Sequence, residues 1–165
     1  MILFLFDMSN KFIFLLDMSN NMNFNTPTTT VLYSIEETIK AYRKLSQQNI
    51  LQVVPDITVD QALVLLLLES NYKTQTEIAN LIFKDYASMT RIVKLMIKKD
   101  YLIKTIDNQD KRKAKLEITK KGKIIIKKLK PIIQINRETA LNAISDEELE
   151  QLYETLKKIT KNCNS

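Results

Sequence analysis

The sequence predicts a mainly α-helical protein with a small β-hairpin, and three observations predict this fold. Two short helical segments lie within residues 74–99 and follow one another closely. An alternating apolar and charged stretch, Ala114–Ile118, then indicates a half-buried strand. A loop rich in cations, residues 107–113, precedes that strand. This order of elements is typical of a winged helix-turn-helix, which presents one helix to a DNA groove and a basic loop beside it.

The composition excludes several kinds of active site. The 165-residue chain is long enough for one domain with a core and too short for two large ones. Its one Gly rules out phosphate-binding loops, which need several glycines for close approach of the backbone. It contains no His, which removes His-based triads and the usual zinc and iron ligand sets. We therefore expect no enzyme, no cofactor and no bound metal.

Cysteine usage and hydropathy indicate a cytoplasmic protein. Cys163 is the only cysteine, so no intrachain disulfide forms and a reducing compartment fits best. The apolar run Ala62–Leu68 is far too short to span a membrane, so we expect no membrane contact.

The net charge of +6 is concentrated in the middle of the chain. Residues 71–130 hold 17 Lys or Arg and 6 Asp or Glu, whereas residues 1–70 and 131–165 are both slightly acidic. Such a concentration of positive charge points to a surface that binds a polyanion. For the charge alone, a solvated lysine-rich face is the alternative explanation.

The first twenty residues form an imperfect repeat, in which residues 1–10 resemble residues 11–20. Each copy has an apolar run that is too short to span a bilayer. With no basic start and no small-residue cleavage site, a signal peptide is not expected. We favour a duplicated or misassigned start upstream of Met18 or Met22, and the alternative is an extra apolar arm at a dimer interface.

Helices are expected on both sides of Pro55. Apolar residues at helical spacing predict a helix over residues 30–48. Thr58 and Gln61 form a capping box that opens the next helix. Its body, Ala62–Leu68, is apolar on all sides and is expected to be the central buried helix.

The two helices of the helix-turn-helix come next. Thr74 and Glu77 form a second capping box, which opens the first of them. Its inner face is expected to hold Ile78, Ala79, Leu81 and Ile82. The second helix begins near Asp85 or Tyr86 and ends at Asp100, because Asp tolerates the left-handed conformation common at helix ends. Its expected buried residues are Met89, Ile92, Val93 and Met96.

A β-hairpin and a long helix follow. Leu102–Ile106 is the expected antiparallel partner of the strand Ala114–Ile118. Thr119 caps a helix over residues 120–142, which Pro131 is expected to kink or break.

The last helix opens at a third capping box, formed by Ser145 and Glu148. Its apolar stripe, and those of the helices over residues 30–48 and 120–142, lie outside the winged helix-turn-helix and need burial. A symmetric partner is the simplest way to cover them. The residues expected at this dimer interface are Val31, Ile35, Leu129, Leu149, Leu152, Leu156 and Ile159.

The helix from Tyr86 onward carries side chains suited to a major groove. Short hydroxyls near a helix start can contact phosphates or base edges, and an Arg can pair bidentately with guanine or phosphate. The DNA-contacting residues expected on this helix are Ser88, Thr90, Arg91, Lys94 and Lys98. An ordinary exposed helix face is the alternative.

The loop of the hairpin is the more specific signal, because it holds Asp110, Lys111, Arg112 and Lys113. A narrow minor groove concentrates negative potential and suits an inserted Arg112. Asp110 can orient that guanidinium by a charge-assisted hydrogen bond. The alternative is that the acidic residues form the turn and the cations are merely solvated.

From Leu51 to Lys128 the chain resembles the MarR family of bacterial transcriptional regulators. The most telling stretches are Asp110–Arg112, which matches the Asp-x-Arg of the family's wing, and Ile118–Gly122, which matches the helix start after it. The other stretches that carry the resemblance are Ile57–Gln61, Gln75–Ala79, Ser88–Val93 and Lys98–Leu102. Asp100 stands where the family usually has Gly, and the Cys near the first helix that marks the redox-sensing branch is absent.

The resemblance implies a homodimeric regulator that binds a pseudo-palindromic site on double-stranded DNA. It also implies repression of a nearby operon, relieved by a small, frequently aromatic or anionic ligand bound between the two halves. Residues 51–119 would form the DNA-binding region, residues 29–50 and 120–165 the dimerisation helices, and residues 1–28 an extension outside the core. Two rival interpretations are a winged helix that binds protein without specific DNA binding, and an enzyme, which the missing His and Gly disfavour.

Overall fold

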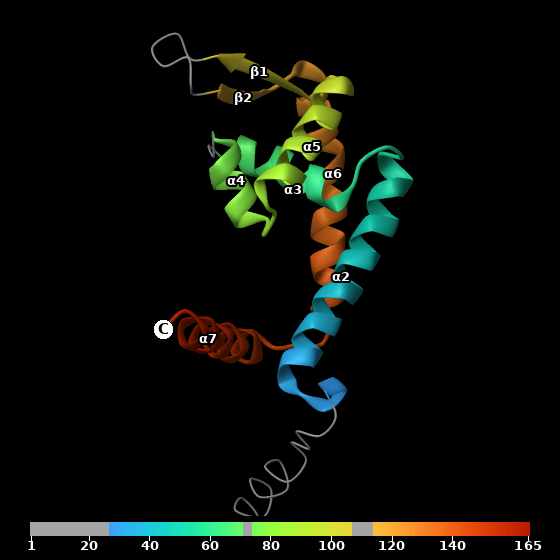
Figure 1. Cartoon of the computed structure of the whole chain (residues 1–165). Coiled ribbons are helices and arrows are strands. Elements are labelled where there is room, and N and C mark those ends of the chain that lie inside the picture. The colour runs from blue at the N-terminus through green and yellow to red at the C-terminus, as the bar shows by residue number, and fades with distance from the viewer. Residues whose placement is uncertain (1–26, 71–73, 107–113) are drawn as a thin grey trace, which may run out of the picture. The chain divides into compact units, whose positions relative to one another are not determined.

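The structure, a computed structural model, describes residues 27–70, 74–106 and 114–165. In chain order its elements are η1 (Pro27–Thr29), α2 (Val31–Val53), α3 (Val59–Glu69), α4 (Gln75–Leu81), α5 (Tyr86–Lys98), β1 (Leu102–Ile106), β2 (Ala114–Ile118), α6 (Lys120–Ala140) and α7 (Asp146–Cys163) (Figure 1). The predicted fold class, mainly helical with a small hairpin, is confirmed. The repeat within residues 1–20 and the loop over residues 107–113 lie outside the described residues.

The chain divides into two compact units, residues 1–44 and residues 45–165. The division falls within α2. The described part of the first unit is largely the beginning of α2, on whose surface Lys40 and Glu36 form an ion pair with an Nζ–Oε1 distance of 2.8 Å. The second unit holds the end of α2, the hairpin and all the helices from α3 to α7.

The predicted helix starts are confirmed by the hydrogen bonds at their caps. Thr58, Thr74 and Ser145 each accept a hydrogen bond from the backbone N–H three residues on, and the side chain of that residue accepts one from the cap N–H. Thr119 caps α6 by accepting from the N–H of Gly122. These bonds satisfy N–H groups that have no partner within the helix.

The hairpin has the predicted strands in antiparallel register, with Leu102 opposite Ile118 and Lys104 opposite Leu116. Leu102 and Leu116 are buried, whereas Ile103 and Lys115, on the opposite face, are exposed. The strand alternation therefore places one face of the hairpin against the core.

The core of the second unit surrounds α3, which contacts α5, α6 and β2. Val64 and Leu65 of α3 are fully buried, so the prediction that this is the central buried helix is confirmed. Figure 1 shows α3, α4 and α5 gathered beside α6. The core also takes in Ile50 near the end of α2, Val54 just after that helix, and Ile125, Ile126 and Leu129 of the first half of α6.

One predicted boundary is wrong for a physical reason. The first helix does not end at residue 48 but continues to Val53, because burial of Ile50 in the core stabilises its last turn. Pro131 was expected to kink or break its helix, and the structure excludes the break, because α6 runs on to Ala140. Pro131 and Lys127 are both exposed, so water can reach the carbonyl that a proline leaves without its partner.

Two predicted side-chain placements are also wrong. Leu81 was expected on the inner face of its helix, but it is the last residue of α4 and is 45% exposed. Leu129 was expected at a dimer interface, but it is fully buried in the core of this chain. Its face of α6 packs on α3, so its apolar surface is already covered.

Among the described residues, none of the helices combines the length and the apolar character needed to cross a membrane.

Candidate nucleic-acid interface

The outer face of α5 carries three exposed cations. Met89, Val93 and Met96 are buried on the inner face of this helix. Arg91, Lys94 and Lys98 recur at spacings of three and four residues on the opposite face and are exposed. In the described part of the chain, no acidic side chain forms an ion pair with them. Their charge is therefore available to an external anion.

The N-terminus of α5 is capped by Asp85. Its carboxylate accepts hydrogen bonds from the backbone N–H of Ser88 at 2.7 Å and from the Ser88 hydroxyl at 2.9 Å. These bonds lower the pKa of Asp85 below its usual value, so the carboxylate is ionised and complements the helix dipole. The hydroxyl of Ser88, which was predicted to contact DNA, is thus used to stabilise the start of α5.

Thr90 connects the two helices of the helix-turn-helix. It is half-buried, and its hydroxyl oxygen accepts a hydrogen bond of 2.8 Å from the amide nitrogen of Gln75, the first residue of α4. A hydroxyl can accept and donate at once, so Thr90 still has a proton to offer to a phosphate or a base. The bond holds α4 and α5 in one arrangement, which a helix that reads DNA requires.

The base of the hairpin lies next to α5, because β1 contacts that helix. On β2, Lys115 and Glu117 form an ion pair with an N–O distance of 3.3 Å. The predicted contacts at the tip, Asp110, Lys111, Arg112 and Lys113, lie outside the described residues.

A polar network that sequence reasoning missed holds the end of α5. The hydroxyl of Tyr101 donates a 2.7 Å hydrogen bond to Asp56, and Lys99 Nζ donates to the Asp56 carbonyl. Lys121 Nζ donates to the carbonyl of Lys99 at 2.8 Å and lies 5.1 Å from the centre of the Tyr101 ring. Burial and the Asp56 hydrogen bond raise the pKa of Tyr101 to about 12. Tyr101 and Asp56 are 45 residues apart, so no local spacing signals their contact.

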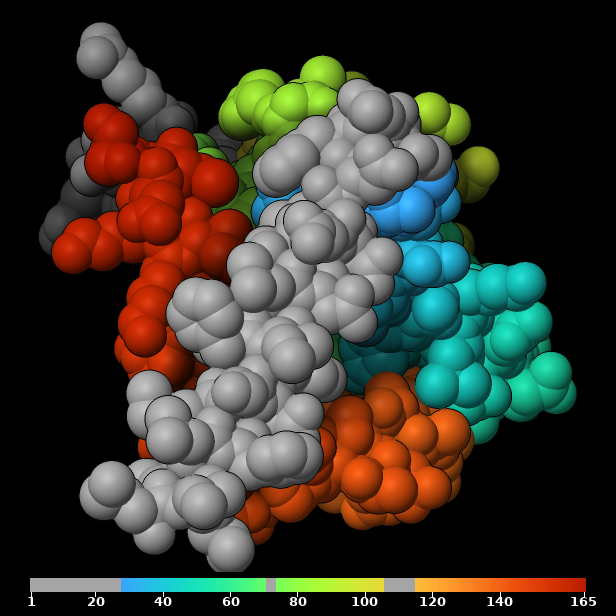
Figure 2. Space-filling model, turned by 90° about the horizontal axis from the view of Figure 1, so that it is seen from below, coloured from blue at the N-terminus to red at the C-terminus, as the bar shows by residue number. Residues whose placement is uncertain are grey.

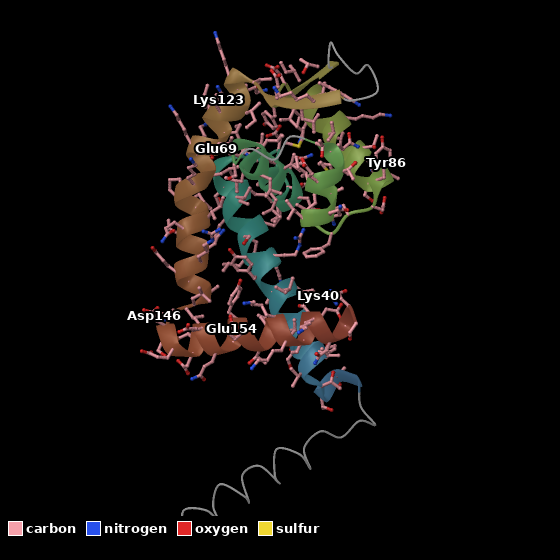
Figure 3. All side chains as sticks on the ribbon, turned by 90° about the vertical axis from the view of Figure 1, so that its left-hand side faces the viewer. Lys40, Glu69, Tyr86, Lys123, Asp146 and Glu154 are labelled. Carbon is pink, nitrogen blue, oxygen red and sulfur yellow. The ribbon has the colours of Figure 1, made fainter. Side chains whose placement is uncertain are left out.

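Two exposed aromatic side chains near the start of α5 were also missed. Phe83, in the turn between α4 and α5, is 93% exposed, and Tyr86, the first residue of α5, is 69% exposed. Figure 3 shows Tyr86 at the outer edge of the molecule beside α4 and α5. The backbone of Phe83 has a φ of 54°, in the left-handed region that bulky residues avoid. Phe83 lies two residues before the N-cap Asp85, and no local sequence pattern marked its exposure.

Residues 56–113 match the model of the MarR family. A curated relative, the HTH-type transcriptional regulator SarZ of Staphylococcus epidermidis, is 31% identical over 110 residues, which are 64% of this chain and 72% of the relative. The chain belongs to the MarR family. SarZ of Staphylococcus aureus is 28% identical over 93 residues, 56% of this chain, and the match covers 59% of that relative's length.

Solved structures with the MarR-family fold are similar to this chain. The transcriptional regulator SlyA has a TM-score of 0.72 at 25% identity, covering 81% of this chain and 93% of that chain. The MepR–DNA complex of Staphylococcus aureus has a TM-score of 0.73 at 20% identity and covers 84% and 99% of the two chains. A mutant Escherichia coli MarR bound to operator DNA has a TM-score of 0.69 at 20% identity and covers 76% and 89%.

In this MarR-family chain, α7 carries an uncovered apolar stripe. None of its residues is buried within the part of the chain that the structure describes. Leu152 is 52% exposed, and Leu149, Leu156 and Ile159 are half-buried. Figure 2 shows α7 (red) at the surface. In the other unit, Val31 is exposed and Ile35 half-buried, so both have apolar surface to offer a partner.

Residues that could bind a metal are not gathered in this MarR-family chain, as far as the structure describes it. Residues 27–70, 74–106 and 114–165 contain no cluster of three or more His, Cys, Asp or Glu side chains arranged to hold an ion. Cys163 is an exposed free thiol.

Proposed function

We propose that this MarR-family chain is a sequence-specific, double-stranded DNA-binding regulator of transcription. The observation that supports it most is the outer face of α5, where Arg91, Lys94 and Lys98 are exposed and have no acidic partner among the described residues. The major groove admits an α-helix, and cations along such a helix can reach both phosphates and base edges. The relatives named as transcriptional regulators and the fold shared with the DNA-bound MepR and MarR structures agree with this proposal.

Each predicted contact has a role in this proposal. Arg91 reads a base edge, and Lys94 and Lys98 neutralise phosphates. Thr90 donates its hydroxyl proton to the DNA, while Ser88 acts through the cap of α5. Beyond the described residues, Arg112 enters the minor groove, oriented by Asp110, and Lys111 and Lys113 contact phosphates.

The regulator acts as a homodimer on a pseudo-palindromic site. The uncovered stripe of α7, with Leu149, Leu152, Leu156 and Ile159, needs burial, and a second copy supplies a matching stripe. Val31 and Ile35 join the same interface. A dimer carries two reading helices, which suits two half-sites about one helical turn apart.

Regulation by a small ligand completes the proposal. We place the protein in the cytoplasm, where its DNA is, as a repressor that such a ligand releases from the operator. No catalytic role is part of the proposal.

The test is selection of bound duplexes from a random pool with the purified full chain. We expect a palindromic motif whose affinity falls steeply with salt, at a log–log slope of about −0.9 per phosphate contact. Arg91→Ala should cost about 1–3 kcal/mol on the selected site and relax its specificity, because a bidentate base contact is lost. Lys98→Ala should instead weaken all sequences alike and reduce the salt slope.

Lys158→Ala is the matched control, because Lys158 is an exposed lysine on α7, away from the reading helix. It should leave site affinity and specificity unchanged. If no duplex is enriched, or if affinity does not depend on salt, the proposal fails and the winged helix is a protein-interaction module.

A further inference from the structure

The outer face of α6 carries a row of lysines. Lys120, Lys123 and Lys127 stand three and four residues apart, so they follow one face of the helix, and all three are exposed. Lys128, beside this row, is exposed as well. These four residues are called the lysine face below. The sequence contains no Asp or Glu between residues 118 and 137, so the face has no acidic neighbour on its own helix.

The four ammonium groups of the lysine face are not neutralised within the described part of the chain. No acidic side chain of that part forms an ion pair with any of them. Two neighbouring lysines of α6 are engaged, since Lys130 pairs with Glu69 at 2.9 Å and Lys121 donates to the carbonyl of Lys99 at 2.8 Å. The charge of the lysine face is therefore available to an external anion.

An ordinary solvated helix surface usually mixes the two signs of charge. Other helices of this chain do so: Glu36 and Lys40 form an ion pair one turn apart on α2, and Glu154 pairs with Lys157 on α7. Such pairs stabilise a helix by a few tenths of a kcal/mol each, about 0.2–0.5 kcal/mol. The lysine face lacks this arrangement, so it is not explained as one more solvated helix surface.

The lysine face also conflicts with the stability of its own helix. The first turns of α3, α4 and α7 contain acidic residues that complement the helix dipole, whereas the first turn of α6 contains none. Lys120 and Lys123 add positive charge at this end, and Lys123 and Lys127, four residues apart, repel each other. Local conflicts of this kind are expected at functional sites, and an anion that covers the face would relieve them.

The composition of the face favours nucleic acid over protein or lipid as its partner. Protein interfaces are depleted in Lys and enriched in Arg and aromatic residues, neither of which belongs to the lysine face. A helix that lies on a membrane needs an apolar face, but Ile125, Ile126 and Leu129 of α6 are buried in the core. Ile124, which is 56% exposed among the lysines, is too little for either partner. Lysines act as point charges, which suits the phosphates of a duplex.

The lysine face and the reading helix belong to different parts of the surface. Figure 3 shows Lys123 on one side of the molecule and Tyr86, the first residue of α5, on the other. The buried helix α3 contacts both α5 and α6. Two separate cationic surfaces on one core can each hold a segment of duplex.

We propose that the lysine face of α6 binds the backbone of a second segment of duplex DNA while α5 holds the operator. The inference rests on the proposed function, because α5 is taken to hold the first segment. The second contact is independent of base sequence, since lysines that neutralise phosphates carry no base code. One regulator thereby holds two segments of duplex together.

The test uses the purified full chain, just saturated with a duplex that is only long enough for the selected site. A second, fluorescent duplex of unrelated sequence is then added, and its capture is measured by anisotropy and by sedimentation of the complex with both duplexes. We expect capture at about 50 mM salt, weakening at a log–log slope of about −0.9 per phosphate contact. Binding of the first duplex is measured separately, so a failure of the proposed function appears there and not in the capture step.

The decisive variant is Lys120→Gln/Lys123→Gln/Lys127→Gln, which removes three charges and keeps three polar side chains. It should capture the second duplex at least about tenfold more weakly, with a salt slope reduced by about 1 for each lysine replaced. It should bind the selected site as the unmodified chain does. Its melting temperature should be equal or higher, because like charges are removed from neighbouring turns.

The matched control is Lys44→Gln/Lys158→Gln/Lys161→Gln, which removes three exposed lysines from α2 and α7. It lowers the net charge by the same amount as the decisive variant and should capture the second duplex normally. Equal losses in the two variants would mean that net charge, and not the lysine face, attracts the second duplex.

Three other results would overturn the proposal. One is no capture of the second duplex at about 50 mM salt. Another is a loss of selected-site affinity in the decisive variant as large as its loss of capture, because the lysine face would then belong to the operator contact. The last comes from a poly-glutamate peptide: if it binds the lysine face more tightly than the second duplex does, the partner is an acidic protein.

Discussion

Replacing Gly122 by Ala is expected to destabilise the fold, although alanine is the better helix former. Gly122 is the third residue of α6 and the only glycine in the chain. A Cβ at this position would lie 2.4 Å from the carbonyl oxygen of Tyr101 and 2.7 Å from Cγ2 of Ile118. Both distances are too short for atoms that are not bonded. Since the first neighbour belongs to the backbone, the start of β1 must move away from α6.

The expected cost follows from opposing contributions. In a helix, Ala is favoured over Gly by about 1 kcal/mol. Overpacking in a close contact costs about 1–3 kcal/mol. Moving the Tyr101 carbonyl also weakens the hydrogen bond of 3.2 Å that it accepts from the N–H of Thr119, and moving the ring weakens the bond of 2.7 Å from its hydroxyl to Asp56. Each bond is worth about 1 kcal/mol, so the free energy of unfolding should fall by about 1–3 kcal/mol in total.

Urea denaturation followed by circular dichroism measures this loss as a lower midpoint at unchanged slope. Lys120→Ala, at the first position of the same helix, is the control, because it changes helix propensity without a close backbone contact. A Gly122→Ala variant as stable as the unmodified chain would refute the close approach of α6 to β1.

Three further substitutions test other parts of the structure. Tyr101→Phe should lower the free energy of unfolding by about 1–2 kcal/mol at neutral pH. The pKa of Tyr101 is about 12 in the folded chain and about 10 when unfolded. The difference in unfolding free energy between the variant and the unmodified chain should therefore hold below pH 10 and shrink as the pH rises to 12. A difference that stays constant over this pH range would contradict the Asp56 contact. Phe83→Gly should raise the free energy of unfolding by about 0.5–1 kcal/mol, because glycine adopts a φ of 54° without strain. Phe83→Ala keeps a Cβ and should gain nothing. Equal effects of the two variants in urea denaturation would show that the backbone at this position is not strained. Leu152→Glu should place an unpaired charge in the proposed dimer interface at a cost of several kcal/mol and give monomers in sedimentation. Gln151→Glu, at another exposed position of α7, should leave the dimer intact. A Leu152→Glu dimer that still binds the selected site would show that α7 does not form the interface.

The helix starts and the strands were predictable because their signals are local. Each capping box spans only four residues, so Thr58, Thr74 and Ser145 identified three helices without knowledge of the fold. The alternation in Ala114–Ile118 spans one strand, and its pairing with Leu102–Ile106 follows from a short connection. Asp100 was expected in the left-handed conformation, and its φ of 58° confirms this.

The features that were missed depend on residues distant in sequence. The last turn of α2 forms because Ile50 is buried by the core, which the local pattern over residues 30–48 does not contain. Leu129 lies on the same apolar stripe as residues expected to face a partner, and only the packing of α6 on α3 shows that it is already covered. Phe83 and Ala143 have positive φ although neither residue type favours it, so composition gave no sign of these turns.

The candidate site was predictable in part. Arg91, Lys94 and Lys98 are exposed on α5, as the helical spacing predicted. The hydroxyl of Thr90 was expected on the same surface, but its oxygen accepts a hydrogen bond from Gln75. Gln75 is 15 residues away in the sequence and lies on another helix. A pattern within one helix cannot show which of its polar groups neighbouring helices use.

The distribution of the lysines changes the argument from charge. Residues 71–130 hold 17 cations, and their concentration first suggested a single surface for a polyanion. The structure divides them, since Arg91, Lys94 and Lys98 lie on α5 while Lys123 and Lys127 lie on α6. Figure 3 shows Lys123 on the opposite side of the molecule from Tyr86, the first residue of α5. The concentration of charge in the sequence therefore does not by itself define one surface that binds DNA.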